Sequence, residues 1–350
     1  MATLVLTGCS SGLGARVLSE LAHSLPIGST IFSGYRSPTP PATPTRLSKE
    51  SQLHWIPLDL TSFDSVDRFV RQVKEKLNRG QDSGGIDCIL LNAATWNNTF
   101  RTSLVEGSEE AWAEEFVVNH LAQFRLAKGL LPLLSNSSTP SSSRRSRIVF
   151  TSSSLQNSLG PQLSSLEKVL SVLQNSADPQ SVARNRYASS KMLQSLSFYS
   201  LQKELQSEEK AIDIVGVSPG FVPTTGLSRD APWWQRLLMK WVIYYLPFCS
   251  TEEQGTRKIL ETLNYLLPSN PFSSTLDDQL SPISPSASPE SASYSRLVFH
   301  PPSLAPTESK STSKVYEEMK ELIESTRGEP TTQQKWKTFM NKVLIDTEVK

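Results

Sequence analysis

The chain has 350 residues, 37% of them hydrophobic, and a formal net charge of +1, which suits one large globular α/β domain. No basic stripe stands out, which argues against a nucleic-acid partner. Cys9, Cys88 and Cys249 lie far apart in sequence, a usage typical of a reduced, intracellular protein rather than of a disulfide framework. Met1 directly precedes the first predicted strand, so we expect no secretion signal, and no stretch reaches the roughly 18 apolar residues of a membrane-spanning helix.

Strands and helices are predicted to alternate along the first two thirds of the chain. Short apolar runs predict strands at 3–6, 30–35, 53–58, 86–91, 147–151 and 212–217. Helical spacing of apolar residues predicts helices at 15–25, 63–77, 109–134, 163–173 and 187–208. Strands separated by helices imply right-handed crossovers, and hence a doubly wound parallel sheet in a three-layer α/β/α arrangement.

The character of the sequence changes after residue 226. Segment 227–250 contains a strongly apolar and aromatic run at 233–248, which fits either a substrate lid that rests on a membrane surface or a helix packed on the core or a partner subunit. Residues 269–295 are a Ser/Pro-rich insert with the composition of a disordered segment. A last strand at 296–300 and two amphipathic helices within 312–346 would then complete a single domain formed by 1–268 and 296–346.

A glycine-rich turn follows the first predicted strand. Gly8, Gly12 and Gly14 stand between that strand and the first helix. Such a turn is typical of a nucleotide-phosphate site, because glycines let the backbone approach a pyrophosphate and a helix N-terminus favours anions. Similar turns also occur where nothing binds, and the spacing differs from the commoner G-x-G-x-x-G. The turn alone therefore leaves both readings open.

A second set of residues has the chemistry of proton transfer. Tyr187 and Lys191 lie four residues apart, on one face of a predicted helix. A nearby ammonium is expected to lower the tyrosine pKa from its usual value of about 10, although the same spacing occurs by chance in many helices. Ser152 and Ser153 follow a strand at the edge where doubly wound sheets bind ligands. Asn119, in an apolar helix, is either a satisfied core amide or a functional group.

Together these residues resemble the short-chain dehydrogenase/reductase family over roughly residues 3–226. The family pattern T-G-x-x-x-G-x-G matches Thr7 to Gly14, and Asn92-Ala93-Ala94 stands where the family has N-A-G, with the last glycine replaced. The resemblance implies a Rossmann-type fold and an NADP-dependent oxidoreductase acting on CH–OH or C=O groups. It also implies a catalytic tetrad of Asn119, Ser153, Tyr187 and Lys191, with Ser152 as the rival of Ser153.

The resemblance assigns a role to each member of the tetrad. Tyr187 is the general acid in ketone reduction, and Lys191 lowers its pKa and holds the nicotinamide ribose. Ser153 polarises the substrate carbonyl, and Asn119 positions a water that connects Lys191 to solvent. The cofactor-binding residues implied are Gly8, Ser10, Ser11, Gly12, Leu13, Gly14, Arg36, Asp59, Leu60, Asn92, Ala93, Tyr187, Lys191, Pro219, Gly220, Val222 and Thr224.

Arg36 bears on the choice between the two nicotinamide cofactors. An acidic residue after the second strand binds the ribose 2′-hydroxyl of NAD, whereas an arginine accommodates the 2′-phosphate of NADP. Tyr35-Arg36 stands at this point, and Ser11 is able to add a hydrogen bond. The sequence therefore predicts NADP(H); the alternative is a solvent-exposed arginine without a ligand. The histidines and cysteines show no metal-ligand spacing, so no metal is expected.

The segment between Ser153 and Tyr187 is long for the family and is expected to lie beside the active site. Several short segments are similar to 3-ketosteroid (sterone) reductases of steroid biosynthesis, and 119–121 is similar to retinol-dehydrogenase-like and protochlorophyllide-reductase-like members. The resemblance implies NADPH-dependent reduction of a lipophilic ketone, either a 3-keto sterol or a retinoid-like or secondary-metabolite carbonyl. A non-catalytic NADP(H)-binding scaffold is the alternative from another class. The expected location is the cytoplasm or the cytoplasmic face of the endoplasmic reticulum.

Overall fold

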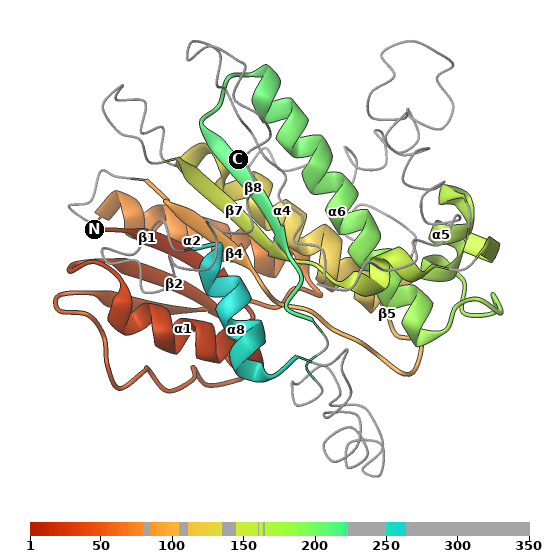
Figure 1. The fold of residues 1–350 in the computed structure, drawn as a ribbon, viewed down its shortest axis with the longest axis horizontal. Coiled ribbons are helices and arrows are strands. Elements are labelled where there is room, and N and C mark those ends of the chain that lie inside the picture. Colours follow the sequence, from red (N-terminus) through yellow and green to blue (C-terminus); the bar gives the residue numbers. More distant parts are fainter. Residues whose placement is uncertain are drawn as a thin grey trace, which may run out of the picture.

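Six parallel strands form the central sheet, in the order β3-β2-β1-β4-β7-β8 (Figure 1). The structure is a computed structural model that describes residues 1–79, 85–104, 111–134, 145–159, 161–163, 165–220, 222 and 250–263. The strands are β1 (Thr3–Thr7), β2 (Thr30–Tyr35), β3 (Gln52–Pro57), β4 (Cys88–Leu91), β7 (Ser146–Thr151) and β8 (Ile212–Val217). The predicted doubly wound parallel sheet is confirmed.

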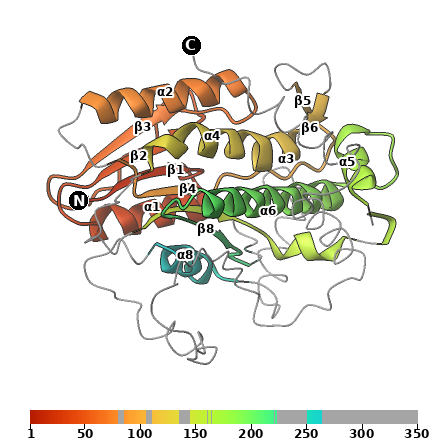
Figure 2. The same cartoon turned by 90° about the horizontal axis from the view of Figure 1, so that it is seen from above.

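Helices cover both faces of the sheet and bury two hydrophobic clusters (Figure 2). One face carries α2 (Phe63–Arg79), α4 (Ala122–Leu130) and α6 (Ala183–Ser207), and the other carries α1 (Gly12–Ser24) and α8 (Glu252–Glu261). Side chains alternate along β1 as a strand requires, since Val5 joins one cluster and Leu4 and Leu6 join the other. The three-layer arrangement therefore follows from strands that are apolar on both faces.

The helix predicted over 109–134 is wrong at its start. Residues Ala111–Ala113 form strand β6, which pairs antiparallel with β5 (Thr102–Leu104), and the Glu114 amide donates to the Arg101 carbonyl at 2.9 Å. Pairing with the preceding strand thus overrides the helical spacing. The rest of the predicted helix is present as α3 (Glu114–Phe116), the π-helix η1 (Val117–Leu121), α4 and the 3-10 helix η2 (Leu131–Leu133).

The segment between Ser153 and Tyr187 folds against α6. It contains the 3-10 helices η3 (Ser154–Ser158) and η4 (Pro161–Leu163) and the helix α5 (Leu166–Gln174), whose apolar residues join the larger hydrophobic cluster. Helix α6 begins at Ala183 rather than at Tyr187 and is buried along most of its length. The tyrosine and lysine of the predicted site therefore lie within a rigid, packed element.

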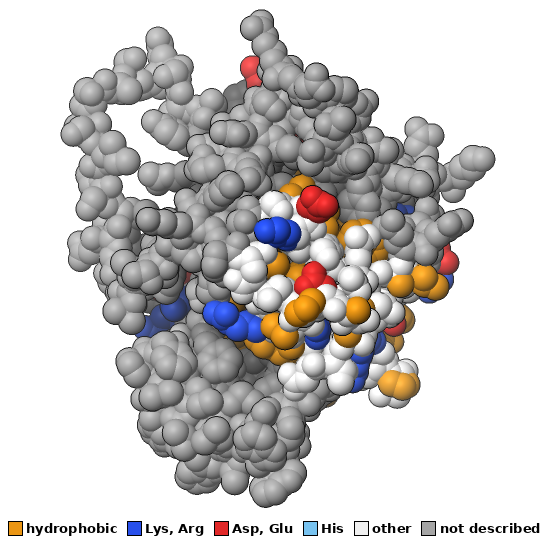
Figure 3. Space-filling model, turned by 90° about the vertical axis from the view of Figure 1, so that its right-hand side faces the viewer, with side chains coloured by type: hydrophobic (Ala, Val, Ile, Leu, Met, Phe, Trp, Pro, Cys, Tyr) orange, Lys and Arg blue, Asp and Glu red, His pale blue; other side chains and the backbone are white. Residues whose placement is uncertain are grey.

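Several predicted segments lie outside the described residues. These are nearly all of the predicted lid at 227–250, the insert at 269–295, the last strand at 296–300 and the helices within 312–346. Within the described part of the chain, no helix is long and apolar enough to cross a bilayer. Seen from the end of the molecule that carries α5, the described surface mixes apolar, basic and acidic side chains (Figure 3).

Candidate active site

The predicted site residues that the structure describes follow the carboxyl ends of parallel strands or lie on helices that reach this edge. The glycine turn follows β1, Arg36 follows β2, Asp59 and Leu60 follow β3, and Asn92 and Ala93 follow β4. Ser153 follows β7, and Pro219, Gly220 and Val222 follow β8. Parallel strands end at one edge of the sheet, so the fold brings these segments together. Thr224 lies outside the described residues.

The glycines of the turn allow close contact between backbone segments. Gly8 and Gly12 have φ values of +69° and +56°, which side chains disfavour. A Cβ on Gly8 would come within 2.6 Å of the Ala93 backbone, and a Cβ on Gly14 would collide with the Gly8 carbonyl oxygen. Only glycine therefore fits at both ends of this turn.

The N-terminus of α1 is open to an anion. Its N-cap residue, Ser11, makes no side-chain capping hydrogen bond, and its first turn contains no acidic residue. Ser10 and Ser11 are exposed. Free backbone N–H groups and the positive end of the helix dipole favour a phosphate at such a position. The residues present thus fit the pyrophosphate of a dinucleotide.

Hydrogen bonds join the glycine turn to the ends of β4 and β7. The Thr7 hydroxyl accepts from the amides of Asn92 at 3.1 Å and Ala93 at 3.2 Å, and it donates to Gln123 at 3.3 Å. The Asn92 amide group donates to the Gly8 carbonyl at 3.1 Å and accepts from the Thr151 hydroxyl at 3.1 Å. Sequence reasoning missed Gln123, although its position one helical turn after Asn119 places both on one face.

Tyr187 and Lys191 lie side by side near the start of α6, and both are buried. The Lys191 Nζ atom is 6.0 Å from the centre of the Tyr187 ring, and it donates to the Thr151 carbonyl at 2.7 Å and to Gln194 Oε1 at 3.1 Å. The Ser153 side chain lies near enough to the Tyr187 hydroxyl to lower the pKa of this phenol. Gln194, also missed from the sequence, is three residues after Lys191 and therefore shares its helical face.

Burial controls the pKa values of this pair. It raises the pKa of Tyr187 to about 12, opposed by the Ser153 side chain, and it lowers the pKa of Lys191 to about 7. The expected lowering of the tyrosine pKa by the neighbouring ammonium is thus outweighed by desolvation of the phenolate. Tyr187 therefore keeps its proton at neutral pH.

The two candidate serines differ in their surroundings. The Ser152 side chain is buried and donates to Gln156 Oε1 at 3.1 Å, beside the Ser195 hydroxyl at 3.4 Å. Ser153 is partly exposed, and its side chain lowers the pKa of Tyr187. The hydroxyl available to a ligand beside the phenol is that of Ser153.

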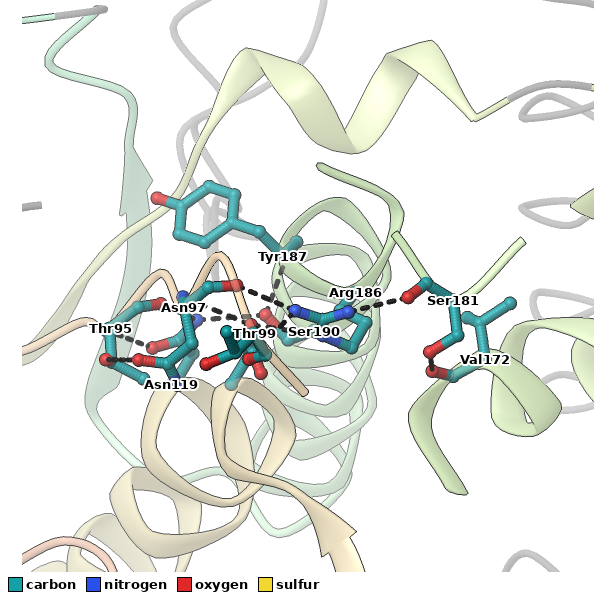
Figure 4. Close-up of polar contacts among 10 residues, drawn as sticks. Thr95, Asn97, Thr99, Asn119, Val172, Ser181, Arg186, Tyr187 and Ser190 are labelled. Atoms are coloured by element: carbon teal, nitrogen blue, oxygen red, sulfur yellow. Dashed lines mark hydrogen bonds and ion pairs between the residues drawn. The ribbon is translucent and has the colours of Figure 1, made fainter. Parts of the chain in front are cut away.

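The Asn119 side chain holds the loop after β4. Its Oδ1 atom accepts from the Thr95 amide at 2.7 Å, and its Nδ2 atom donates to the Thr95 carbonyl at 3.0 Å and to the Ser190 hydroxyl at 3.0 Å (Figure 4). Asn119 lies in the π-helix η1, an irregular turn of a kind frequent at functional sites. The described contacts join it to Thr95 and Ser190 rather than to Lys191.

A buried ion pair precedes Tyr187 and was not found from the sequence. Arg186 pairs with Glu115 at 3.2 Å, and their side chains are 2% and 0% exposed. The guanidinium also donates to the carbonyls of Asn97 at 2.7 Å, Thr99 at 3.3 Å and Ser181 at 2.6 Å (Figure 4). Burial raises the pKa of Glu115, although the charge of Arg186 opposes this. This network fixes the loop after β4 against the start of α6.

The remaining predicted residues lie at the rim of this edge. Arg36 is exposed, and Asp59 Oδ1 accepts from the Thr61 amide at 3.0 Å and the Thr61 hydroxyl at 2.8 Å, which orders the turn before α2. Gly220 has a φ of +88°.

Helix α8, which was not predicted, contacts Leu13 and Val222 through Gly255. Within the described ranges, no three His, Cys, Asp or Glu side chains are placed to hold a metal ion.

Comparisons with known proteins agree with this geometry. The family model described as short chain dehydrogenase matches residues 2–165. The chain is 30% identical over 230 residues to the short-chain dehydrogenase/reductase GME11359 of Pestalotiopsis microspora, covering 65% of this chain and 72% of that protein. It is 27% identical to protochlorophyllide reductase B of Hordeum vulgare, covering 72% of this chain and 65% of the barley protein.

A solved structure shows the same fold. The crystal structure of an uncharacterized protein from Mycobacterium paratuberculosis superimposes with a TM-score of 0.50 and 22% sequence identity, covering 75% of this chain and 76% of that one. Neither of the two named relatives is described as a sterone or retinol enzyme, so they support the family without supporting that branch. The chain belongs to the short-chain dehydrogenase/reductase family, the NAD(P)-dependent oxidoreductases that act on CH–OH and C=O groups.

Proposed function

We propose that this protein reduces a lipophilic ketone to an alcohol, with NADPH as the hydride donor and Tyr187 as the general acid. The observation that carries the proposal is the pair of Tyr187 and Lys191, which are buried together on α6 with the Lys191 Nζ atom 6.0 Å from the centre of the phenol ring. These groups share one edge of the sheet with the glycine turn and the open N-terminus of α1. A 3-keto sterol remains a candidate substrate only through the similarity of short sequence segments.

The proposed step needs one proton and one hydride. Bound NADPH would supply the hydride to the carbonyl carbon. Ser153 and Tyr187 would both donate to the carbonyl oxygen, and Tyr187 would give its proton to the alkoxide that develops there. The resulting phenolate would be stabilised by the Lys191 ammonium. A phenol with a pKa of about 12 is protonated at neutral pH, which is the state in which it can donate a proton.

A Tyr187→Phe variant tests this proposal. It keeps the ring contacts and removes the proton donor, so NADPH oxidation with a reducible ketone should fall by about 10²–10⁴-fold, the usual contribution of a general acid. The assay would screen sterones, retinal, bicyclic ketones and small ketones, with NADPH binding measured separately by fluorescence. Unchanged turnover, with NADPH binding retained, would contradict the assigned role. Unchanged cellular function without turnover would favour the non-catalytic scaffold.

We also propose that NADPH is preferred over NADH through Arg36. This arginine is exposed immediately after β2, and no acidic residue accompanies it there to bind a ribose 2′-hydroxyl. An Arg36→Ala variant should lose affinity for NADPH by about tenfold, while its affinity for NADH stays nearly constant, because only NADPH carries the 2′-phosphate. Dissociation constants for both cofactors would test this. Equal losses of affinity for NADPH and NADH would show that Arg36 does not bind the 2′-phosphate.

A further inference from the structure

Trp96 lies against the candidate general acid. Its ring centre is 4.8 Å from that of Tyr187, and the two ring planes are inclined by 38°. Trp96 is partly exposed, whereas Tyr187 is only 6% exposed. The part of the indole that remains accessible therefore offers an aromatic surface next to the phenol that would donate the proton.

The backbone on each side of Trp96 is fixed by side chains from α3, η1 and α6. Before it, both polar atoms of the Asn119 amide bond to the backbone of Thr95, at 2.7 and 3.0 Å. After it, Arg186 donates to the Asn97 carbonyl at 2.7 Å, and Glu115 accepts from the Asn97 amide at 3.2 Å. Figure 4 shows Asn119 beside Thr95, and Arg186 beside Asn97. Trp96 is therefore held in place before any ligand binds, which lowers the entropic cost of using it for recognition.

We infer that Trp96 is a specificity-determining residue that selects carbonyl compounds with a flat aromatic ring beside the reacting group. This inference rests on the proposed function and narrows its substrate class. A ketone whose oxygen approaches the Tyr187 and Ser153 hydroxyls places the adjoining rings near the indole. A flat aromatic ring gains an offset-stacked or edge-to-face contact there, whereas a saturated ring of the same size gains only apolar burial.

Two ketones of one carbon skeleton isolate this difference. 2-Tetralone and trans-2-decalone are both bicyclic, neither carbonyl is conjugated to a ring, and only 2-tetralone contains an aromatic ring. The measurement is the ratio of kcat/KM for 2-tetralone to that for 2-decalone, with NADPH as the cofactor. Comparing the same ratio between variants cancels the intrinsic reactivity of each ketone.

Replacing Trp96 should change this ratio, mainly through KM. In Trp96→Leu the preference for 2-tetralone should fall by roughly 2- to 12-fold, the range for loss of one aromatic pair, whereas Trp96→Phe should keep most of it. Trp55→Leu, which removes another partly buried tryptophan from strand β3, should leave the ratio unchanged. If Trp96→Leu does not fold, as judged by circular dichroism, Trp96→Met provides the same comparison.

The possible results separate this inference from the proposed function. A folded Trp96→Leu variant with the wild-type ratio of kcat/KM would overturn the role of Trp96 and leave the reductase intact. If the wild-type enzyme fails to oxidise NADPH with every carbonyl of the panel, both the role of Trp96 and the proposed reductase function are overturned.

Discussion

Lys191 shows how burial of a single residue couples cofactor binding to pH. Burial lowers the pKa of its ammonium to about 7, so the free protein loses this cation as the pH rises through neutrality. An anionic dinucleotide favours the charged form, and binding above pH 7 must therefore take up a proton. The dissociation constant for NADPH should rise between pH 7 and 9, by at most about tenfold per pH unit.

A fluorescence titration of NADPH at several pH values would test this expectation. The control is Lys191→Met, which keeps an apolar side chain of similar length and has no proton to lose. We expect this variant to bind NADPH more weakly, with little change between pH 7 and 9. Parallel pH curves for the two proteins would mean that another group causes the dependence.

At the scale of elements, the regular strands and helices were predictable and the pairing of irregular segments was not. β2 (Thr30–Tyr35) and β8 (Ile212–Val217) match their predicted bounds, because short apolar runs between turns carry their own signal. Strand β6 was missed because only its partner, β5, makes it a strand. Arg186 and Glu115 are separated by 71 positions, so no local pattern relates their charges.

The ion pair of Arg186 and Glu115 should stabilise the contact between α6 and the loop after β4. Arg186→Met leaves the Glu115 carboxylate buried without its cation, which should lower the free energy of unfolding by about 3–5 kcal/mol. Replacing both residues, in Glu115→Leu/Arg186→Met, should cost less than the sum of the single changes, because no unpaired charge remains. Urea unfolding measures each value.

A surface ion pair provides the matched control for this experiment. Arg257 and Glu253 lie one helical turn apart on α8, at 3.6 Å, with side chains 55% and 78% exposed. Arg257→Met should lower the unfolding free energy by less than about 1 kcal/mol, because solvent screens the pair. An equal effect of the two arginine substitutions would contradict the importance of burial for Arg186.

At the scale of the whole molecule, the topology explains why the site residues could be anticipated. The glycine turn follows one strand, and the segments that contain the site asparagine, serine and proline each follow another. Parallel strands present their carboxyl ends at one edge of the sheet. What the sequence could not supply was the set of buried contacts between layers. Gln123 and Trp96 contact residues of other elements, Thr7 and Tyr187, and the pKa of Tyr187 depends on how deeply packing buries it.

The packed layers should also make the molecule sensitive to acid through His120. This side chain is fully buried between Phe116 and Phe124, with ring centres 5.2 and 6.2 Å away, and its Nε2 atom is 2.8 Å from the Ser197 hydroxyl. Burial, assisted by the charge of Lys191, lowers its pKa from 6.5 to about 3. Between these values the unfolded chain binds the proton and the folded protein does not, so the free energy of unfolding falls as the pH falls.

The size of this effect follows from linkage. Between pH 6.5 and 5, His120 should remove about 2 kcal/mol from the free energy of unfolding. Over this interval, the free energy of unfolding of a His120→Gln variant should fall by about 2 kcal/mol less than that of the wild type. The control is His23→Gln, which changes an exposed histidine and should behave like the wild type. The raised pKa of Glu115 acts in the opposite direction, but it is present in all three proteins and cancels in the comparison. Urea unfolding at pH 7, 6 and 5 would measure the three slopes, and identical slopes for His120→Gln and the wild type would show that the histidine is not the residue that limits acid stability.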